Sequence, residues 1–303
     1  MANTFGVANS HALFSRWNYG DPPVAPLIGG AALSGGSWLS TLPLTNMQNR
    51  LLAQVAQSTD LALSSTQFLI TLDKPRMLQI FALLGHNLST SAQIRVTGYS
   101  DAGLTTVYPN ADSGWVDAFP VYAPMSQLAP EDANWLTGKP TLENLDRFPR
   151  VSFYLFPNVH NVQYWLVQIN DTANTNGYVS IGRLFAAPIV QTSVNFLYDS
   201  GFGWASDTAY KRSKGGVKFF NTSPPYRTVG LNFDFLTSSE MYYSFMEMQR
   251  RLGKDREFFV CLFPNNLQYR TLFSFQANFE SLSQFTWKNY ARQAIQFQLT
   301  ESL

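Results

Sequence analysis

Alternating apolar and polar positions begin near residue 66 and predict β-strands. Phe68, Ile70 and Leu72 alternate with polar neighbours, as in a strand with one buried face. Lys74-Pro75-Arg76 is expected to be a turn, and further strands are expected at residues 77–84, 92–100, 151–156, 162–169 and 178–187. No amphipathic helix separates these runs, so residues 66–190 are expected to form an antiparallel β-sandwich.

The last third of the chain predicts a second β-rich domain. Strands are expected at residues 226–236, 257–263, 269–279 and 292–300. Apolar residues keep helical spacing between the first two of these strands, at Met241, Phe245, Met248 and Leu252. We therefore expect a β-sandwich with one helix over residues 191–303, joined to the first domain near residues 188–200.

Start and stop signals bound this helix. Thr237 and Glu240 have capping-box spacing, in which the hydroxyl caps the first turn and the carboxylate reaches back. Arg250 and Arg251 lie in the last turn, where a cation is favoured. Gly253 can end the helix.

Residues 1–65 show no regular pattern and are expected to form an irregular extension. Prolines and glycines interrupt the segment at Pro22, Pro23, Pro26, Gly29, Gly30, Gly35 and Gly36. Its large apolar side chains, such as Trp17 and Trp38, bury area only by lying on another surface. An ordered loop on the same chain and an arm that reaches a neighbouring subunit both fit residues 42–49.

Composition points to assembly rather than to an electrostatic partner. The 21 basic residues nearly balance the 20 acidic ones, which argues against a specific nucleic-acid binder and against an acidic membrane as a partner. Charged residues make up 14% of the chain, below the usual quarter or so, whereas aromatic residues make up 15%. A weakly charged, aromatic-rich surface is typical of a protein that packs against other subunits.

The single cysteine and the absence of long apolar runs limit the cellular setting. Cys261 lies in the apolar run 257–263 and is interpreted as a packed thiol, so a disulfide framework within the chain is excluded. Folding in a reducing cytoplasm is expected. No apolar run reaches the ~18 residues of a spanning helix, and we expect neither membrane insertion nor a signal peptide.

The sequence carries no recognisable motif for catalysis or metal binding. His11, His86 and His160 lie far apart, without a metal-ligand partner at helical or hairpin spacing. The chain has no nucleophile elbow, phosphate loop or dinucleotide fingerprint. The residues around Gly216 and Lys218 do not form a phosphate loop, since no Ser or Thr follows the lysine. We expect a protein that is not an enzyme and has no catalytic, cofactor or metal site.

A glycan hydrolase needs a pair of carboxyl groups about 5–10 Å apart. The candidates are Asp101, Asp112, Asp117, Glu131, Asp132 and Asp171. All lie in expected turns or loops, where acidic residues are solvated or stabilise the turn. That interpretation is favoured over hydrolysis.

A short loop supplies oxygen ligands of the kind that Ca²⁺ takes, from Asp171, Asn174 and Asn176. An Asx-rich turn before a strand is favoured over a metal site, because Asn176-Gly177 is a typical turn pair.

Two further features allow binding. Trp115, Tyr122 and Trp135 lie in a long irregular segment at residues 101–148 and could stack on sugar rings, although loop anchoring or subunit contact is favoured. The basic stretch 211–218 could face a partner or DNA, although a solvated hairpin with a Gly-Gly turn is favoured.

Two stretches within residues 66–190 carry a family resemblance. The first consists of residues 77–89, followed by residues 92–96 and 99–101. The second comprises residues 164–165, 169–171, 174, 176–178 and 181–184. Together they resemble the galactose-binding-like, discoidin-type jelly rolls of minor tail proteins from long-tailed bacteriophages. The resemblance implies that His86-Asn87 ends a core strand and that Asn176-Gly177-Tyr178 turns into the strand with Gly182-Arg183. Residues 191–303 resemble phage tail-tube and distal-tail ring proteins in layout.

These resemblances imply a structural component of a phage tail tip or baseplate, a ring or collar that joins the tail tube to the hub or receptor-binding parts. The implied partners are copies of the same chain in a threefold or sixfold ring and the tail-tube, hub and fibre proteins. The implied location is the virion tail, after synthesis in the host cytoplasm. The alternative is a carbohydrate-binding module that recognises a host surface glycan.

Overall fold

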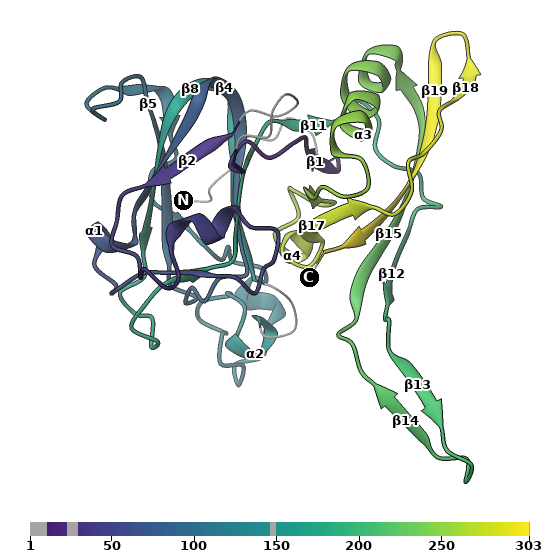
Figure 1. The fold of residues 1–303 in the computed structure, drawn as a ribbon, viewed down its shortest axis with the longest axis horizontal. Helices are drawn as coiled ribbons and strands as arrows, with labels where there is room; N and C mark the ends of the chain where they lie inside the picture. The colour runs from purple at the N-terminus through teal and green to yellow at the C-terminus, as the bar shows by residue number, and fades with distance from the viewer. Residues whose placement is uncertain (1–10, 23–29, 146–149, 303) are drawn as a thin grey trace. The chain divides into compact units, whose positions relative to one another are not determined.

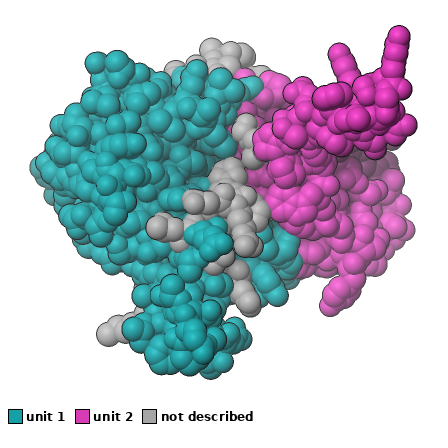
Figure 2. Space-filling model, turned by 90° about the horizontal axis from the view of Figure 1, so that it is seen from below, with its two compact units in different colours: residues 1–191, 259–274 teal, residues 192–258, 275–303 magenta. Residues whose placement is uncertain are grey.

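The computed structural model describes residues 11–22, 30–145 and 150–302, which form mainly antiparallel β-strands (Figure 1). The expected mainly β, antiparallel fold class is confirmed. The chain divides into two compact units (Figure 2). Unit 1 comprises residues 1–191 and 259–274, and unit 2 comprises residues 192–258 and 275–303.

Unit 1 contains most of the strands. They are β1 (Leu13–Ser15), β2 (Ala31–Ser34), β3 (Ala56–Gln57), β4 (Phe68–Leu84), β5 (Gln93–Tyr99), β6 (Val107–Asp112), β7 (Val116–Asp117), β8 (Val151–Asn170), β9 (Ser180–Ile181), β10 (Arg183–Ala187) and β11 (Ile189–Gln191). Strand β16 (Phe258–Cys261) begins at the boundary between the units and lies mostly in unit 1. Short helical segments are η1 (Leu44–Gln48), α1 (Leu63–Thr66), η2 (Met125–Gln127), α2 (Leu142–Leu145) and α4 (Leu267–Arg270).

Two long strands, β4 and β8, pair with each other and are interrupted at the same place. Register shifts lie between Thr71 and Arg76 and between Leu78 and Ile80. The first half of β4 pairs with β2 and the second half of β8; the second half of β4 pairs with β10 and the first half of β8. Strand β5 extends the sheet beside β8 and pairs with β6 and β7. The expected turn at residues 74–76 is thus an irregularity inside one strand.

The middle strands of unit 1 are buried on both faces, because other strands pack against each face. Every residue of β10 and the last five of β4 are buried. On one face, Phe259 of β16 packs with its ring 5.1 Å from that of Phe153. On the other, the ring of Phe81 lies 4.6 Å from Trp165, which belongs to the half of β8 beyond the interruption. Continuous apolar runs, rather than alternation, are what such a middle layer requires.

Gly98 of β5 lies directly opposite Trp165 of β8 in the same sheet. A Cβ atom there would lie 3.1 Å from the Trp165 ring and 3.0 Å from the Cβ of Ala111. Both distances are tighter than ordinary contact, so glycine at this position leaves room for the Trp165 ring.

The described parts of residues 1–65 belong to the body of unit 1. Strand β1 pairs with β11 and β16, β2 with β4, and β3 with β9. Residues 42–49 include η1, in which Leu44 and Met47 are buried. These residues lie on their own chain, in contrast to an arm that reaches a neighbour; Pro23, Pro26 and Gly29 fall outside the described residues.

Unit 2 contains β12 (Gly201–Ala205), β13 (Ala209–Arg212), β14 (Lys218–Asn221), β15 (Tyr226–Thr237), β17 (Ser274–Phe279), β18 (Thr286–Asn289) and β19 (Arg292–Glu301). Strands β17, β19, β15 and β12 lie in this order, with β18 also paired to β19, and β13 and β14 form a separate hairpin. Residues 259–274, expected in this second domain, lie instead in unit 1.

The predicted helix is present as the continuous segments η3 (Glu240–Met246) and α3 (Glu247–Leu252). Its four spaced apolar residues, Met241, Phe245, Met248 and Leu252, are all buried. The ring of Phe245 lies 5.0 Å from Phe297 and 5.8 Å from Phe233, so the helix covers the apolar face of β15 and β19.

Both predicted helix boundaries are confirmed. The backbone N–H of Glu240 donates to the Thr237 hydroxyl (3.3 Å), and the Glu240 carboxylate accepts from the Thr237 backbone N–H (2.8 Å). At the other end, Gly253 has φ 59° and its N–H donates to the carbonyl of Gln249. A positive φ there suits glycine.

Candidate interaction surface

The hairpin of β13 and β14 stands apart from the main sheet of unit 2, beyond β12 and β15 (Figure 1). Tyr210 pairs with Phe220 and Lys211 with Phe219. The Ser213 N–H donates to the Val217 carbonyl (2.8 Å) and closes the turn, where Gly216 has φ 85°. The predicted hairpin for the basic stretch is therefore confirmed.

Hydrogen bonds hold the base of this hairpin. The Ser223 N–H donates to the Thr208 hydroxyl (3.1 Å), which donates in turn to the Ser223 carbonyl (3.2 Å). The Tyr226 hydroxyl contacts the Asp207 carboxylate at 3.3 Å. The hairpin thus leaves the sheet through a hydrogen-bonded base rather than through a free linker.

All eight strand residues of the hairpin are exposed, including three aromatic side chains. Phe219, Phe220 and Tyr210 are 65%, 59% and 57% exposed. Tyr210 and Phe220 contact each other (centroids 6.0 Å apart), and Lys218 lies over the Tyr210 ring at 4.8 Å. A two-stranded hairpin has no core of its own, and clustered exposed rings typically mark a binding surface.

A second exposed aromatic pair lies at the turn between β18 and β19. Trp287 is 69% exposed and Tyr290 is fully exposed. Lys288 lies 3.5 Å from the Asp234 carboxylate and links β18 to β15. Unit 2 thus presents aromatic side chains on two hairpins, and we call them the β13–β14 hairpin and the β18–β19 hairpin.

In unit 1, the chain between β7 and β8 also exposes apolar side chains. Residues 119–145, here called the excursion, include Val121, Met125 and Leu136, of which Leu136 is 77% exposed. Within the excursion, the Asn134 amide donates to the Lys139 carbonyl (2.7 Å) and to the Tyr122 hydroxyl (3.3 Å). Tyr122 thus takes part in anchoring this segment, as favoured from the sequence.

The other two aromatic candidates differ from each other. Trp135 is half-buried, and its backbone N–H donates to the Asp132 carbonyl (2.9 Å) within the excursion. Trp115 is 37% exposed and precedes β7. Trp115 therefore has the more accessible ring of the two.

The candidate hydrolase carboxylates serve local structure. Hydrogen bonds from Thr105 and Thr106 hold the pKa of Asp101 below its usual range. The Arg95 guanidinium does the same to the pKa of Asp112. A glycosidase acid needs a raised pKa instead.

The remaining acidic candidates take part in local contacts or are exposed to solvent. Asp117 lies 3.1 Å from the Lys139 ammonium group, Asp132 accepts from the Ala129 N–H (2.8 Å), and Glu131 is exposed. Among the residues that the structure describes, no group of three or more His, Cys, Asp or Glu side chains could hold a metal ion.

The oxygen-rich loop that follows β8 is tied up by internal hydrogen bonds. The Asp171 carboxylate accepts from the Ser89 N–H (2.9 Å) and from the Asn174 amide (2.9 Å). The Asn174 side chain also donates to the Asn87 carbonyl (3.1 Å) and accepts from the Asn176 N–H (3.0 Å). This is the geometry of an Asx-rich turn, in which Asp171 and Asn174 are buried.

The residues of the family resemblance assemble around the same turn. Asn87 accepts from the Ser180 N–H (2.8 Å) and donates to the Tyr178 carbonyl (2.9 Å). His86 follows the end of β4 and is buried against Phe119, and burial lowers its pKa to about 3. The motif therefore closes one end of the sandwich and exposes no imidazole.

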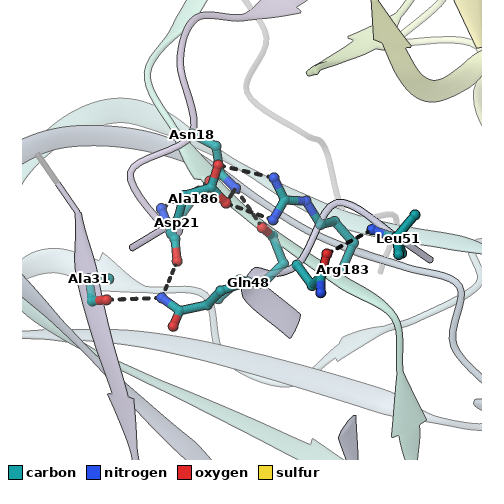
Figure 3. Close-up of polar contacts among 10 residues, drawn as sticks. Asn18, Asp21, Ala31, Gln48, Leu51, Arg183 and Ala186 are labelled. Carbon is teal, nitrogen blue, oxygen red and sulfur yellow. Dashed lines mark hydrogen bonds and ion pairs between the residues drawn. The ribbon is translucent and has the colours of Figure 1, made fainter. Parts of the chain in front are cut away.

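Arg183, which also belongs to that motif, holds the N-terminal segment on β10 (Figure 3). It makes a two-pronged ion pair with Asp21 (2.7 and 3.0 Å), and burial raises the pKa of Asp21 while Arg183 opposes that shift. The Asn18 amide donates to Asp21 (2.8 Å) and to the Leu184 carbonyl (2.7 Å), and Gln48 donates to the Ala31 carbonyl (2.9 Å). Arg183 is fully buried and has a structural role.

The two other histidines and the cysteine belong to unit 1, whereas the two aromatic hairpins belong to unit 2. His160 is buried in an aromatic cluster with Phe156 and Trp165, and burial lowers its pKa. His11 is half-buried ahead of β1. Cys261 is buried in β16, where burial raises the pKa of its thiol, as expected for a packed side chain.

Sequence reasoning missed the exposure of the aromatic side chains on the β13–β14 hairpin. Phe219 and Phe220 are adjacent and therefore point to opposite faces of their strand. The strand thus lacks the alternation of apolar and polar residues that a strand with one buried face shows. Lysines and an arginine flank them on both strands. Adjacent aromatic residues among cationic ones were the sequence signal that could have predicted an exposed aromatic hairpin.

Searches for related proteins give only distant structural matches. No family model and no curated protein matches the sequence. The first carbohydrate-binding module (CBM32-1) of a family 31 glycoside hydrolase from Clostridium perfringens aligns with 56% of this chain and 99% of its own, at 11% identity and a TM-score of 0.34. The family 32 module of C. perfringens NanJ, solved in complex with galactose, aligns with 52% of this chain and 93% of its own, at 12% identity and a TM-score of 0.35.

Neither match carries a functional residue over to this chain. No helix among the described residues is long and apolar enough to cross a membrane. The chain is thus a mainly β, two-unit protein whose most distinctive surface features are the two aromatic hairpins of unit 2.

Proposed function

We propose that this chain is a non-enzymatic assembly subunit that forms a ring or collar, as in the tail tip or baseplate of a long-tailed bacteriophage. In that setting it joins the tail tube to the hub or receptor-binding parts. The observation that carries the proposal is the exposed aromatic surface of the β13–β14 hairpin. The phage setting rests on the sequence resemblance alone.

The energetic argument concerns the aromatic rings. Removing a Phe side chain from water contributes about 1.5–3 kcal/mol. Phe219, Phe220 and Tyr210 leave that free energy unused in the isolated chain, because the hairpin has no second layer. Aromatic residues are also enriched at the centres of protein interfaces. A partner protein surface is the simplest cover for them.

A matched set of variants tests the proposal. Tyr210, Phe219 and Phe220 are replaced together by Thr, which keeps strand propensity but removes the rings. Native mass spectrometry and electron microscopy of the wild-type chain should show assemblies of three or six 34.1 kDa copies. The triple variant should lose them. The control, Met77→Thr, removes an exposed apolar side chain of unit 1 and should leave assembly unchanged. Assembly that survives the triple substitution contradicts the proposal.

A carbohydrate-binding module is the second candidate function, and Trp115 favours it. This exposed ring lies directly before β7, whose Val116 pairs with Ile94, the neighbour of Arg95. Arg95 and Asp112 form an ion pair there (Nε–Oδ1 2.9 Å), so an aromatic face and charged hydrogen-bonding groups lie on one edge of the sheet. Sugar recognition uses such a combination of a ring and polar groups.

Glycan-array binding and calorimetry with the purified chain test this second function. Sugar binding that Trp115→Ala abolishes would support it, and Trp287→Ala, which removes a more exposed tryptophan on unit 2, serves as the control. Absence of binding at millimolar sugar would remove it.

A further inference from the structure

We propose that the β13–β14 hairpin of one copy binds the excursion of a second copy, so that the chain assembles head to tail. This inference rests on the proposed assembly function and names its contact. The two surfaces belong to different units and carry opposite charges: the hairpin is cationic and the excursion is anionic.

The hairpin supplies positive charge and aromatic area. Lys211, Arg212, Lys214 and Lys218 give it four cations, and no acidic residue occurs between Ala209 and Asn221. The strand residues Lys211, Arg212 and Lys218 are exposed, as are Lys214 and Val217 in the turn. The surface is therefore cationic and apolar at once.

The excursion supplies the complementary chemistry. Val121, Met125 and Leu136 are its exposed large apolar side chains, and Glu131, Asp132 and Glu143 are exposed carboxylates. Its single basic residue, Lys139, is half-buried and lies 3.1 Å from Asp117. The surface is thus anionic and apolar.

Internal hydrogen bonds define the shape of the excursion before any partner binds. The Gly138 N–H donates to the Asn134 carbonyl (2.7 Å), and the Asp132 carboxylate accepts from the Ala129 N–H (2.8 Å). Gly138 has φ 61°, and a Cβ there would lie 2.4 Å from the Ala123 carbonyl oxygen. A preorganised surface loses less conformational entropy on binding than a mobile loop does.

The charge balance of the whole chain favours a second copy over nucleic acid. Without the four hairpin cations, 17 basic residues remain against 20 acidic ones, which gives −3 from an overall +1. A polyanion that approached the hairpin would meet net negative charge on the rest of the chain. A second copy is close to neutral overall (+1), so its anionic excursion meets less of that repulsion than a polyanion does.

A contact of this kind can also close an assembly. Hairpin and excursion are different surfaces, so their contact is heterologous, and it closes into a ring when the rotation between copies divides a full turn. Each copy would then use one hairpin and one excursion and leave neither uncovered.

Disulfide trapping between differently tagged full-length copies tests the contact directly. One copy carries Phe219→Cys and the other Leu136→Cys; the native Cys261 is buried and gives little background. We expect a cross-linked heterodimer under mild oxidation. The matched control pairs Phe219→Cys with Val159→Cys, an exposed position of unit 1 outside the excursion, and should not cross-link.

Charge reversal then tests the chemistry of the contact. Lys211→Glu with Lys218→Glu should lower the yield of the 219–136 cross-link about tenfold, which corresponds to ~1.4 kcal/mol of binding free energy. Glu131→Lys with Asp132→Lys should do the same, and a mixture that carries both reversals should recover the yield. Recovery would not follow if the substitutions merely unfolded either surface.

The outcomes separate this inference from the proposed function. Assembly without a 219–136 cross-link overturns the inference and leaves the assembly function standing. A cross-link within one copy in the Phe219→Cys, Leu136→Cys double variant, without any between copies, also overturns it. Hairpin-dependent binding of a labelled single-stranded oligonucleotide, together with no cross-link, would assign the hairpin to nucleic acid. Monomers at every protein concentration, with no cross-link, overturn both proposals.

Discussion

The two units use aromatic residues in opposite ways. In unit 1, Phe81, Phe156 and Trp165 form a closed cluster between layers, with ring centroids 4.6–6.0 Å apart. Unit 2 has a comparable buried cluster around Phe245, but it also presents Phe219 and Trp287 on hairpins outside that core. The high aromatic content of the chain therefore reflects both buried clusters and exposed hairpins, and only the exposed hairpins point to a partner.

The largest effect is expected where an aromatic side chain fills the core of unit 2. Phe245→Ala should lower the free energy of unfolding by about 3–5 kcal/mol, because it leaves a cavity between Phe233 and Phe297. Tyr243→Ala, on the same helix but 75% exposed, should change it by at most ~0.5 kcal/mol. Thermal and urea unfolding measure both. Equal effects would mean that this helix does not cover the sheet.

A pH effect should distinguish unit 1. His86 has a pKa lowered to about 3 by burial and, secondarily, by the charge of Arg150, whereas its unfolded value is near 6.5. The unfolded chain therefore binds a proton that the folded chain excludes, and stability falls as the pH drops below 6.5. The loss reaches up to ~1.4 kcal/mol per pH unit.

Urea midpoints at pH 7 and pH 5 measure this slope. His86→Gln, which keeps an acceptor near the Leu88 N–H, should flatten it. His160, whose pKa burial also lowers, should leave a residual slope of the same sign. An unchanged slope in the variant would show that His86 is not the group that titrates.

A smaller effect is expected at the helix start. Thr237→Ala removes the hydroxyl that accepts from the Glu240 N–H, and this should cost about 1 kcal/mol. Ser239→Ala is the control, because the exposed Ser239 makes no side-chain capping bond. If both variants unfold alike in thermal melts, the capping box contributes nothing measurable.

The smallest effect on stability is expected at the aromatic hairpin. Phe219→Thr and Phe220→Thr together should change the unfolding free energy of the monomer by no more than ~0.5 kcal/mol, since neither ring contributes to a core. The same pair should weaken self-association measured by analytical ultracentrifugation. A destabilised monomer would instead mean that the rings pack on their own chain.

Local features were the most predictable part of the fold. The capping box at Thr237, the glycine stop at Gly253 and the hairpin at residues 211–218 each depend on a few neighbouring residues, and all are present. The Asx turn after β8 is local in the same sense. Sequence patterns report such features because the interacting groups lie within a few residues of each other.

Long-range pairings were less predictable. The apolar run that contains Phe259 indicates a buried strand, yet nothing in it says that the strand joins β1 in unit 1. Similarly, the pattern gave separate strands around residues 74–76, whereas β4 continues through them with a register shift. At the candidate surface, the exposure of Phe219 depends on the absence of a second layer, which no local pattern encodes.

The late placement of β16 has a consequence for how the protein is made. Translation releases residues 1–191 first and then the 67 residues 192–258 of unit 2. Most of strand β16, which completes a core cluster of unit 1, follows only afterwards. Domains generally fold as units while the chain emerges, N-terminal segments first. Unit 1 must therefore wait with Leu13 and Phe185 uncovered while the ribosome completes most of the neighbouring unit. Nascent chains stalled before residue 259 should accordingly engage a chaperone, and those stalled well beyond residue 274 should release it.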